Sequence, residues 1–390
     1  MMKALGRIYF DCNATAPLRP QAREKMLSAL DLVGNPSSVH LEGRAARRII
    51  EEARGAVARL VGGEARNVTL VASGTEAANL ALTPRVESPG LNGPLAQLIL
   101  SAGEHPCVLR GHRFAPDAIA VAPLDSDGRI DLDALRGAVA GLDRPVMLAL
   151  QAANNETGVV QPVVEAAAII HEIGGTVVCD AVQVAGRAPC DIAALGADLI
   201  FLSAHKLGGP KGAGALIAAS SALHIAEPLV RGGGQERGLR AGTENVAAIA
   251  GFGAAAQAAK SDIEVEAKRL AGLRNGLEAA VLAAAPDAVI FGAGVERLPN
   301  TLCFAVPDVA AETLVIGLDL AGFAVSSGSA CSSGKVARSH VLTAMGVEPG
   351  LALGAVRLSL GWASSADEVE RFAEAFERVL APMRRGRNAA

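Results

Sequence analysis

The sequence predicts an α/β fold in which a large domain, built on a largely parallel sheet, is followed by a smaller α+β domain. Short apolar runs alternate with longer helical patterns between residues 68 and 219, and this alternation is typical of βαβ units. From residue 263 onward the pattern changes to a long charged helix. With 390 residues, of which 51% are hydrophobic, the chain is long enough to bury more than one core.

Each expected element follows from a run of this pattern. The strands expected in the large domain are residues 68–72, 98–101, 146–150, 176–179, 199–203 and 215–218. The C-terminal part is expected to contain a helix over 264–282, a strand over 301–306, a helix over 310–321 and a strand over 355–360. Residues 83–95 are rich in Pro and Gly, which predicts a surface loop.

The change of pattern also sets the expected domain boundaries. We expect an N-terminal arm, residues 1–15, that packs with the small domain. The large domain then comprises residues 16–260, and the small C-terminal domain comprises residues 261–390.

Composition excludes several classes of function. A formal net charge of −4 provides no basic field for nucleic acid. No apolar run approaches the roughly 20 residues that span a bilayer, and the first residues lack the apolar segment of a signal peptide, so a cytoplasmic protein is expected. The six cysteines form no C-x-x-C pair, so neither a zinc site nor a disulfide framework is expected.

Polar residues follow the ends of the expected strands, which is where an open parallel sheet binds ligands. After residues 68–72 comes the tetrapeptide SGTE, which contains Gly74 and Thr75. Glycine allows close approach, and the N–H groups that open a helix can hold a phosphate. An ordinary helix N-cap explains the same residues equally well.

Two further strand ends carry weaker signals. His105 follows residues 98–101 and offers a flat ring that could stack on a cofactor or move protons, although a lone histidine is more often structural. The cluster NNETG, residues 154–158, contains Asn155 and follows the next strand, where a simple turn is the alternative interpretation.

Lys206 and Asp180 supply the most informative pair. Ser203 is the last residue of the run 199–203, and His205 and Lys206 come directly after it. Asp180 comes directly after the run 176–179, and Gln183 follows three residues later. A lysine that binds an aldehyde and a carboxylate that keeps a ring nitrogen protonated are the two groups that pyridoxal phosphate needs most. The alternative interpretations are a surface cation for Lys206, which the preceding buried strand disfavours, and a common strand-end cap for Asp180.

Cys331 lies in the Ser/Gly-rich stretch SSGSACSSG, residues 326–334. Cys179 and Cys303 lie in apolar strands, where a thiol behaves as a small hydrophobic group. The neighbours of Cys331 suit an exposed loop instead, and reactive cysteines are partially exposed. Cys331 is therefore a candidate nucleophile.

In order, these motifs resemble those of the class V pyridoxal-phosphate-dependent aminotransferase family, and specifically cysteine desulfurases of the NifS/IscS type. The matching segments cover nearly the whole chain and are residues 11–17 (DCNATAP), 34–40 (GNPSSVH), 73–76 (SGTE), 154–156 (NNE), 180–183 (DAVQ), 205–206 (HK) and 326–331 (SSGSAC). The resemblance implies a fold-type I enzyme whose large domain has a mainly parallel seven-stranded sheet.

The resemblance also implies a role for each matching residue. Lys206 holds pyridoxal 5'-phosphate, His105 stacks on its ring, and Cys331 takes the sulfur. Cofactor contacts are assigned to Gly74, Thr75, Asn155, Asp180, Gln183, Ser203, His205 and, from a neighbouring subunit, Thr243. Substrate contacts are assigned to Asn13, Asn155 and Arg357. No set of metal ligands is expected, apart from Cys331 as a transient ligand of an iron–sulfur cluster.

The implied reaction converts L-cysteine to L-alanine and leaves a persulfide on Cys331, with Lys206 or His105 moving the proton. The implied partners are a second copy of the chain and a sulfur acceptor in nitrogenase-cluster assembly, general iron–sulfur assembly or tRNA thiolation. Ala16 departs from the family's second threonine. Three alternatives stay open: a selenocysteine lyase, an aminotransferase and a non-catalytic sulfur-relay partner.

Overall fold

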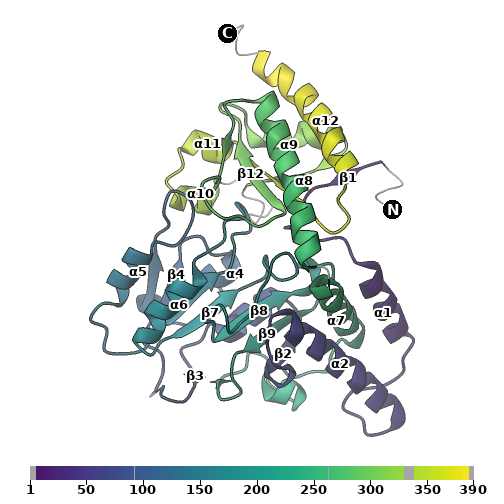
Figure 1. Ribbon diagram of the computed structural model, residues 1–390. Coiled ribbons are helices and arrows are strands. Elements are labelled where there is room, and N and C mark those ends of the chain that lie inside the picture. Colours follow the sequence, from purple (N-terminus) through teal and green to yellow (C-terminus); the bar gives the residue numbers. More distant parts are fainter. Residues whose placement is uncertain (1–5, 92, 262, 329–337, 386–390) are drawn as a thin grey trace.

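The computed structural model describes residues 6–91, 93–261, 263–328 and 338–385, and a seven-stranded sheet dominates its larger part (Figure 1). The strand order is β2-β9-β8-β7-β6-β4-β5. The strands are β2 (Val68–Val71), β4 (Leu98–Ser101), β5 (Ile119–Ala122), β6 (Met147–Gln151), β7 (Thr176–Asp180), β8 (Leu199–Ser203) and β9 (Gly214–Ala218). The neighbouring pairs β7–β8, β6–β7, β4–β6 and β4–β5 are parallel. Strand β9 is antiparallel to both of its neighbours, β2 and β8. The mainly parallel sheet is therefore confirmed.

Helices cover both faces of this sheet because successive side chains of its strands point to opposite sides. In β8, Ile200 and Leu202 join one buried cluster, whereas Leu199 and Phe201 join another. The first cluster includes residues of α2, α5, α6 and α7, and the second includes residues of α3. The bounds of these helices are α2 (Leu41–Leu60), α3 (Gly74–Ala81), α5 (Leu132–Val139), α6 (Val163–Glu172) and α7 (Val246–Ser261).

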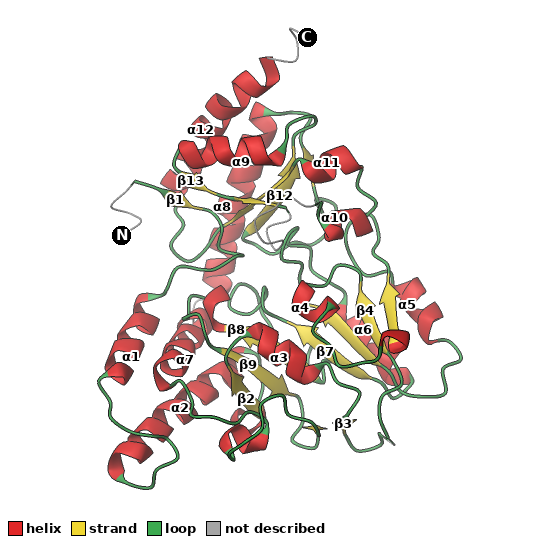
Figure 2. Ribbon diagram, turned by 180° about the vertical axis from the view of Figure 1, so that it is seen from behind, coloured by secondary structure: helices red, strands yellow, loops and turns green. Residues whose placement is uncertain are grey.

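A second sheet of four antiparallel strands follows, in the order β11-β12-β15-β14. Its strands are β11 (Val289–Ile290), β12 (Thr301–Ala305), β14 (Ser326–Ser327) and β15 (Ala355–Ser359). The long helices α8 (Ile263–Ala284), α9 (Ala311–Leu320) and α12 (Ala366–Arg385) gather around it, as the view from behind shows (Figure 2). The short helices α10 (His340–Ala344) and α11 (Pro349–Leu353) lie beside it.

The N-terminal residues join this second part of the molecule. Strand β1 (Ile8–Tyr9) pairs in parallel with β13 (Phe323–Ala324). Phe10 is fully buried, with its ring centroid 6.1 Å from that of Phe323 and 6.0 Å from that of Phe372. Helix α1 (Pro20–Leu30) then packs with α7 on the large sheet. The domain boundaries after residues 15 and 260 stay predictions.

Two local expectations need correction. Strand β5 was not expected, because its sequence IAVA is short and lies at the edge of the sheet, where three of its four residues keep some exposure. Residues 83–95 are not simply a surface loop, because β3 (Val86–Glu87) pairs antiparallel with β10 (His224–Ile225). Val86 and Ile225 are buried, and this burial offsets the turn-forming composition around them.

No helix within the described ranges combines the length and the apolar character required to cross a membrane.

The buried ring of Phe10 predicts a large effect on stability. Phe10→Ala should lower the free energy of unfolding by about 3–5 kcal/mol, because a buried aromatic side chain leaves a cavity. Leu320→Ala is the matched control, since this side chain is 84% exposed, and it should change stability by less than about 0.5 kcal/mol. Urea denaturation followed by circular dichroism provides the measurement. Equal effects of the two variants would show that the N-terminal residues do not belong to this core.

Candidate active site

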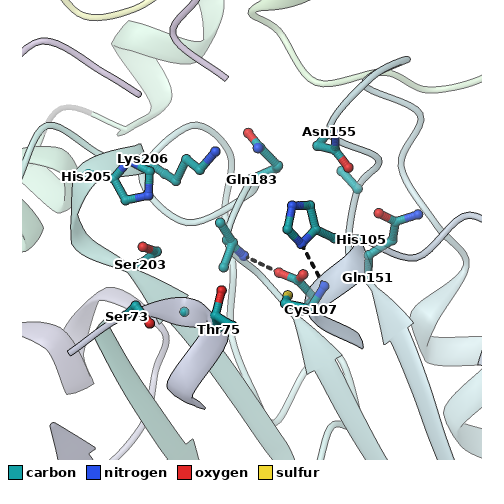
Figure 3. Close-up of a pocket in the computed structure, with 14 residues that line it drawn as sticks. Ser73, Thr75, His105, Cys107, Gln151, Asn155, Gln183, Ser203, His205 and Lys206 are labelled. Carbon is teal, nitrogen blue, oxygen red and sulfur yellow. Dashed lines mark hydrogen bonds between the residues drawn. The ribbon is translucent and has the colours of Figure 1, made fainter. Parts of the chain in front are cut away.

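A pocket of about 230 Å³ lies at the carboxyl ends of β2, β4, β6, β7 and β8, which all run in the same direction. A cavity of about 150 Å³ can hold benzene, so this volume is sufficient for a substituted single ring. The residues that line it are Ser73, Gly74, Thr75, His105, Cys107, Gln151, Ala153, Asn155, Asp180, Val182, Gln183, Ser203, His205 and Lys206. In Figure 3, Lys206 and Ser203 lie on one side, and His105 and Asn155 lie on the other.

The structure thus brings together nine of the residues singled out from the sequence: Gly74, Thr75, His105, Asn155, Asp180, Gln183, Ser203, His205 and Lys206. Sequence reasoning missed Cys107 and Gln151. Both follow from their position, because Cys107 lies two residues after His105 and Gln151 is the last residue of β6, paired in register with Asp180. The ends of the neighbouring strands were the signal that could have found them.

The first turn of α3 forms one wall of the pocket. Ser73 is its N-cap and accepts a hydrogen bond from Glu76 N at 3.0 Å, while Glu76 Oε2 accepts one from Ala72 N at 2.9 Å. A Cβ atom on Gly74 would lie 3.1 Å from the Cβ atom of Ser203. Glycine therefore lets the helix start approach the end of β8 closely. The N-cap interpretation is confirmed, and the same first turn lines the pocket, where helix N–H groups favour an anion.

Lys206 enters the pocket from a short 3-10 turn, Ala204–Lys206, directly after β8. Its Nζ donates to the carbonyl oxygens of Asn13, at 2.5 Å, and Ala14, at 3.0 Å. The Asn13 carbonyl also accepts a hydrogen bond from Gln183 Nε2 at 3.1 Å. The N-terminal segment therefore holds the amine of Lys206 in position.

Asp180 also lines the pocket and is only 7% exposed. Its Oδ1 accepts a hydrogen bond from Val182 N at 2.9 Å. Burial raises the pKa of this carboxyl to about 6, against the opposing effects of that hydrogen bond and of the positive charge of Lys206. The carboxyl group would therefore be stabilised in its charged form by a cation placed against it in the pocket.

Glu104 lies behind the pocket and is fully buried. Its Oε1 accepts a hydrogen bond from Gln151 N at 2.8 Å, and its Oε2 has no partner among the described residues. Burial, reinforced by the charge of Asp180, raises the pKa of Glu104 well above its ordinary value. Glu104 is therefore harder to ionise than an ordinary glutamate, and its Oε1 holds the end of β6, where Gln151 pairs in register with Asp180.

His105 presents a neutral ring. It is the N-cap of α4 (Pro106–Leu109), and its Nδ1 accepts a hydrogen bond from Cys107 N at 3.1 Å. Burial lowers the pKa of His105 to about 4, and the charges of Lys206 and His340 act in the same direction. The ring can therefore stack on an aromatic group, but it is a weak base at neutral pH.

Arg357 and Asn13 lie next to the pocket without lining it. Arg357 is 2% exposed and donates from Nη2 to Asp11 Oδ1, at 2.6 Å, and from Nη1 to the Asn155 carbonyl, at 2.9 Å. Its Nε has no partner among the described residues. Asn13 Nδ2 donates to Thr301 Oγ1 at 2.9 Å and to the same Asn155 carbonyl at 3.2 Å. Both side chains thus meet at Asn155.

The remaining predicted site residues lie elsewhere. Thr243 is exposed and does not line the pocket of its own chain. Cys331 lies outside the described residues. Cys179 and Cys303 are fully buried, and burial raises the pKa of both thiols, so their assignment to the core is confirmed.

The donor set suits one kind of ligand. The amine of Lys206 can bind a carbonyl carbon, and the carboxylate of Asp180 can pair with a protonated ring nitrogen. The α3 start and Ser203 suit an anionic group, and His105 offers a flat surface. The pocket therefore fits an aromatic aldehyde that carries a basic nitrogen and a phosphate.

Comparison with known proteins extends this description. The pattern of the family described as Aminotransferase class-V matches residues 8–372. A protein named cysteine desulfurase from Cereibacter sphaeroides is 41% identical over 386 residues, which cover 97% of each chain. Cysteine desulfurase IscS of Dictyoglomus turgidum is 37% identical, over 97% of this chain and 95% of that protein. The X-ray structure of a NifS-like protein from Rickettsia africae has a TM-score of 0.86 at 35% identity, covering 96% of this chain and 99% of that one.

The raised pKa of Asp180 predicts how stability depends on pH in the cofactor-free protein. Between the ordinary value of 3.8 and about 6, the folded chain keeps a proton that the unfolded chain loses, so this group's contribution to stability falls as pH rises. Asp180→Asn keeps an acceptor for Val182 N and cannot ionise. The free energy of unfolding of the variant minus that of the wild type should therefore rise by about 3 kcal/mol over this window.

Urea denaturation at a series of pH values measures this difference. His105 and His205 have pKa values lowered to about 4 and give the opposite pH dependence, but they are common to both proteins and cancel. Parallel pH profiles of the two proteins would contradict the burial of an ionised Asp180.

Proposed function

Because the chain belongs to the aminotransferase class-V family, we propose that it is a pyridoxal-phosphate-dependent cysteine desulfurase. It takes sulfur from L-cysteine, releases L-alanine, and passes the sulfur from Cys331 to an acceptor. The observation that supports this most strongly is the placement of Lys206 and Asp180 in one pocket, beside the start of α3.

The residues of the pocket fit pyridoxal 5'-phosphate in four ways. Lys206 would hold the aldehyde carbon, and Asp180 would pair with the ring nitrogen. Gly74, Thr75, Ser203 and His205 would hold the phosphate, and His105 would stack on the ring, with Asn155 and Gln183 at its edges. When bound, this group acts as an electron sink for the carbon next to the substrate amine.

The surroundings of His105 bear on which residue moves the proton. Nδ1 of His105 is engaged by Cys107 N, and the pKa of the ring is lowered to about 4 by burial. An efficient base needs a pKa near the working pH. We therefore propose that the amine of Lys206, which lines the same pocket, moves the proton, and that His105 serves mainly to hold the ring in place.

Arg357 is proposed to bind the carboxylate of the substrate. Asp11 and the Asn155 carbonyl already orient its guanidinium, and Nε keeps a donor without a partner among the described residues. A guanidinium held in this way can offer a fork of donors to a carboxylate. Asn13 would act less directly, since its amide is used by Thr301 and Asn155.

Cys331 would carry out the sulfur transfer. As a thiolate it attacks the sulfur of the substrate, so that an S–S bond forms while the bond between that sulfur and the β-carbon breaks. The electron pair of the broken bond stays on carbon, which takes up a proton and leaves as alanine. The persulfide on Cys331 is then available to an acceptor protein of iron–sulfur cluster assembly or of another sulfur-using route, in the cytoplasm.

A homodimer is proposed as the working form. Thr243 is exposed and is assigned to the cofactor phosphate of the neighbouring subunit. Large apolar side chains are exposed in one short segment that runs from the last residue of α1 to the first residue of α2, where Leu30, Val33, Val39 and Leu41 are 66–86% exposed. Exposed apolar groups that gather in this way are typical of an interface. No nucleic acid or membrane is proposed as a partner.

Lys206→Ala should abolish covalent attachment of the cofactor and remove the yellow colour of the purified protein. Among the lysines that the structure describes, Lys206 is the only one that lines the pocket. Borohydride reduction followed by peptide mapping should place the pyridoxyl group on Lys206, and Lys211→Ala should behave as the wild type does. A pyridoxyl label on any other lysine would refute the assignment.

Cys331→Ser should keep the cofactor and still bind L-cysteine, but it should release neither alanine nor sulfide. Serine preserves the size of the side chain, but its hydroxyl is far too weak an acid to supply a nucleophilic anion near neutral pH. Mass spectrometry of the wild type after treatment with L-cysteine should find one added sulfur on Cys331. Full alanine production by the variant, or added sulfur on Cys107 or Cys12, would show that another residue is the nucleophile.

A further inference from the structure

Residues 232–243 run along the edge of the large sheet and end at Thr243. At this edge Glu236 accepts a hydrogen bond from Leu70 N of β2 at 2.8 Å. Arg54 donates two hydrogen bonds to the same carboxylate, at 2.6 Å from Nη1 and 2.7 Å from Nη2. The side chains of Glu236 and Arg54 are 1% and 6% exposed. The segment is therefore fixed to the sheet by a buried ion pair that also satisfies a strand-edge N–H group.

The backbone at this anchor is unusual. Glu236 and Arg237 have φ values of 48° and 58°, in the left-handed region that side chains with a Cβ disfavour. Among the described residues, Asp308 is the only other non-glycine residue with a positive φ. Two adjacent residues persist in this conformation only where their surroundings fix them, and such strain is concentrated at functional segments. Arg237 contributes by donating from Nη2 to the Val68 carbonyl at 2.7 Å.

A second attachment lies closer to Thr243. Arg240 Nε donates to Glu76 Oε1 at 3.1 Å, and Glu76 belongs to the first turn of α3, which lines the pocket. Gln235 Oε1 accepts a hydrogen bond from Gly242 N at 3.1 Å and so closes the segment into a compact loop. Thr243 therefore leaves a loop whose start and end are both fixed, and it is exposed to solvent.

We propose that Glu236 is a positioning residue: held by Arg54, it fixes the shape of residues 235–242 so that Thr243 is presented to the cofactor pocket of a second copy of the chain. This inference rests on the proposed homodimer with pyridoxal phosphate. It also gives a reason for the positive φ values of Glu236 and Arg237. A loop that stabilised only its own chain would not need to hold an exposed residue such as Thr243 in a fixed position. In the dimer, the anchor in one subunit supports cofactor binding in the other.

Glu236→Gln tests the proposal on the purified holoenzyme. Glutamine keeps the size of the side chain and an acceptor for Leu70 N, but it loses the charge that orients Arg54. Glu51→Gln is the matched control, since Glu51 also accepts a hydrogen bond from Arg54, at 3.1 Å, but is 46% exposed and belongs to the same helix as Arg54. Thr243→Ala provides the benchmark for a lost phosphate contact.

Three measurements are made on each protein: the dissociation constant of pyridoxal phosphate, the oligomeric state by sedimentation, and hydrogen–deuterium exchange by peptide. Glu236→Gln should weaken cofactor binding by about tenfold, as Thr243→Ala does, because one hydrogen bond to a charged group is misplaced. Exchange should become faster in peptides from residues 231–245 and stay unchanged in peptides from β6, β7 and β8. Glu51→Gln should match the wild type in all three measurements.

Arg240→Gln is a second test variant, for use if Glu236→Gln does not fold and shows rapid hydrogen–deuterium exchange in all its peptides. The side chains of Arg240 and Glu76 are 26% and 18% exposed, so their ion pair can be lost without leaving a buried charge. This variant should weaken cofactor binding in the same direction. The proposal is overturned if both variants fold and bind the cofactor as tightly as a dimeric wild type does. It is also overturned if Glu236→Gln does not fold while Arg240→Gln folds and keeps the cofactor affinity of the wild type. A monomeric wild type that retains the cofactor fully would refute the homodimer itself.

Discussion

The arrangement of the site depends on one buried carboxylate, that of Asp180, and on the amine of Lys206 held in the same pocket. Asp180 is placed by β7 and Lys206 by the turn after β8, and these strands are adjacent and parallel. A carboxylate in a site of low dielectric constant is costly unless a cation or hydrogen-bond donors meet it. In the proposed complex with pyridoxal phosphate, a protonated ring nitrogen would supply that cation, so the residue that is costly in the cofactor-free protein would be the one that selects the ligand.

The N-terminal segment joins this pocket to the smaller sheet. The carbonyl of Asn13 accepts hydrogen bonds from Lys206 and Gln183, while its side chain donates to Thr301 on β12. On the same side, Arg357 of β15 reaches the carbonyl of Asn155. A displacement of either sheet would therefore change the position of the Lys206 amine. These hydrogen bonds therefore bring residues 13, 155, 206 and 357, far apart in sequence, close together.

Strand ends were predictable from the sequence because a buried parallel strand is a nearly continuous apolar run, and the polar residue that ends it is conspicuous. Asp180 was identified in this way, and Gly74 and Lys206 were identified because they closely follow such runs. Gln151 was missed although it too is a polar residue that ends a buried strand, and its hydrogen bond to the Gly103 carbonyl is a contact that only the folded chain shows. The hydrogen bond between Glu104 and Gln151 and the ion pair of Arg54 with Glu236 could not be predicted for the same reason. The partners in these contacts are 47 and 182 residues apart in sequence. The role of Cys331 rests on its sequence neighbours and on the resemblance.

The central claim is that Asp180 is charged and meets the ring nitrogen of the cofactor. Reconstitution with pyridoxal phosphate labelled with ¹⁵N at the ring nitrogen, followed by ¹⁵N NMR, tests this most directly, because the chemical shift separates the protonated from the unprotonated nitrogen. The wild type should show a protonated nitrogen near neutral pH, and Asp180→Asn should show an unprotonated one. An unprotonated nitrogen in the wild type, or the same shift in both proteins, would contradict the account.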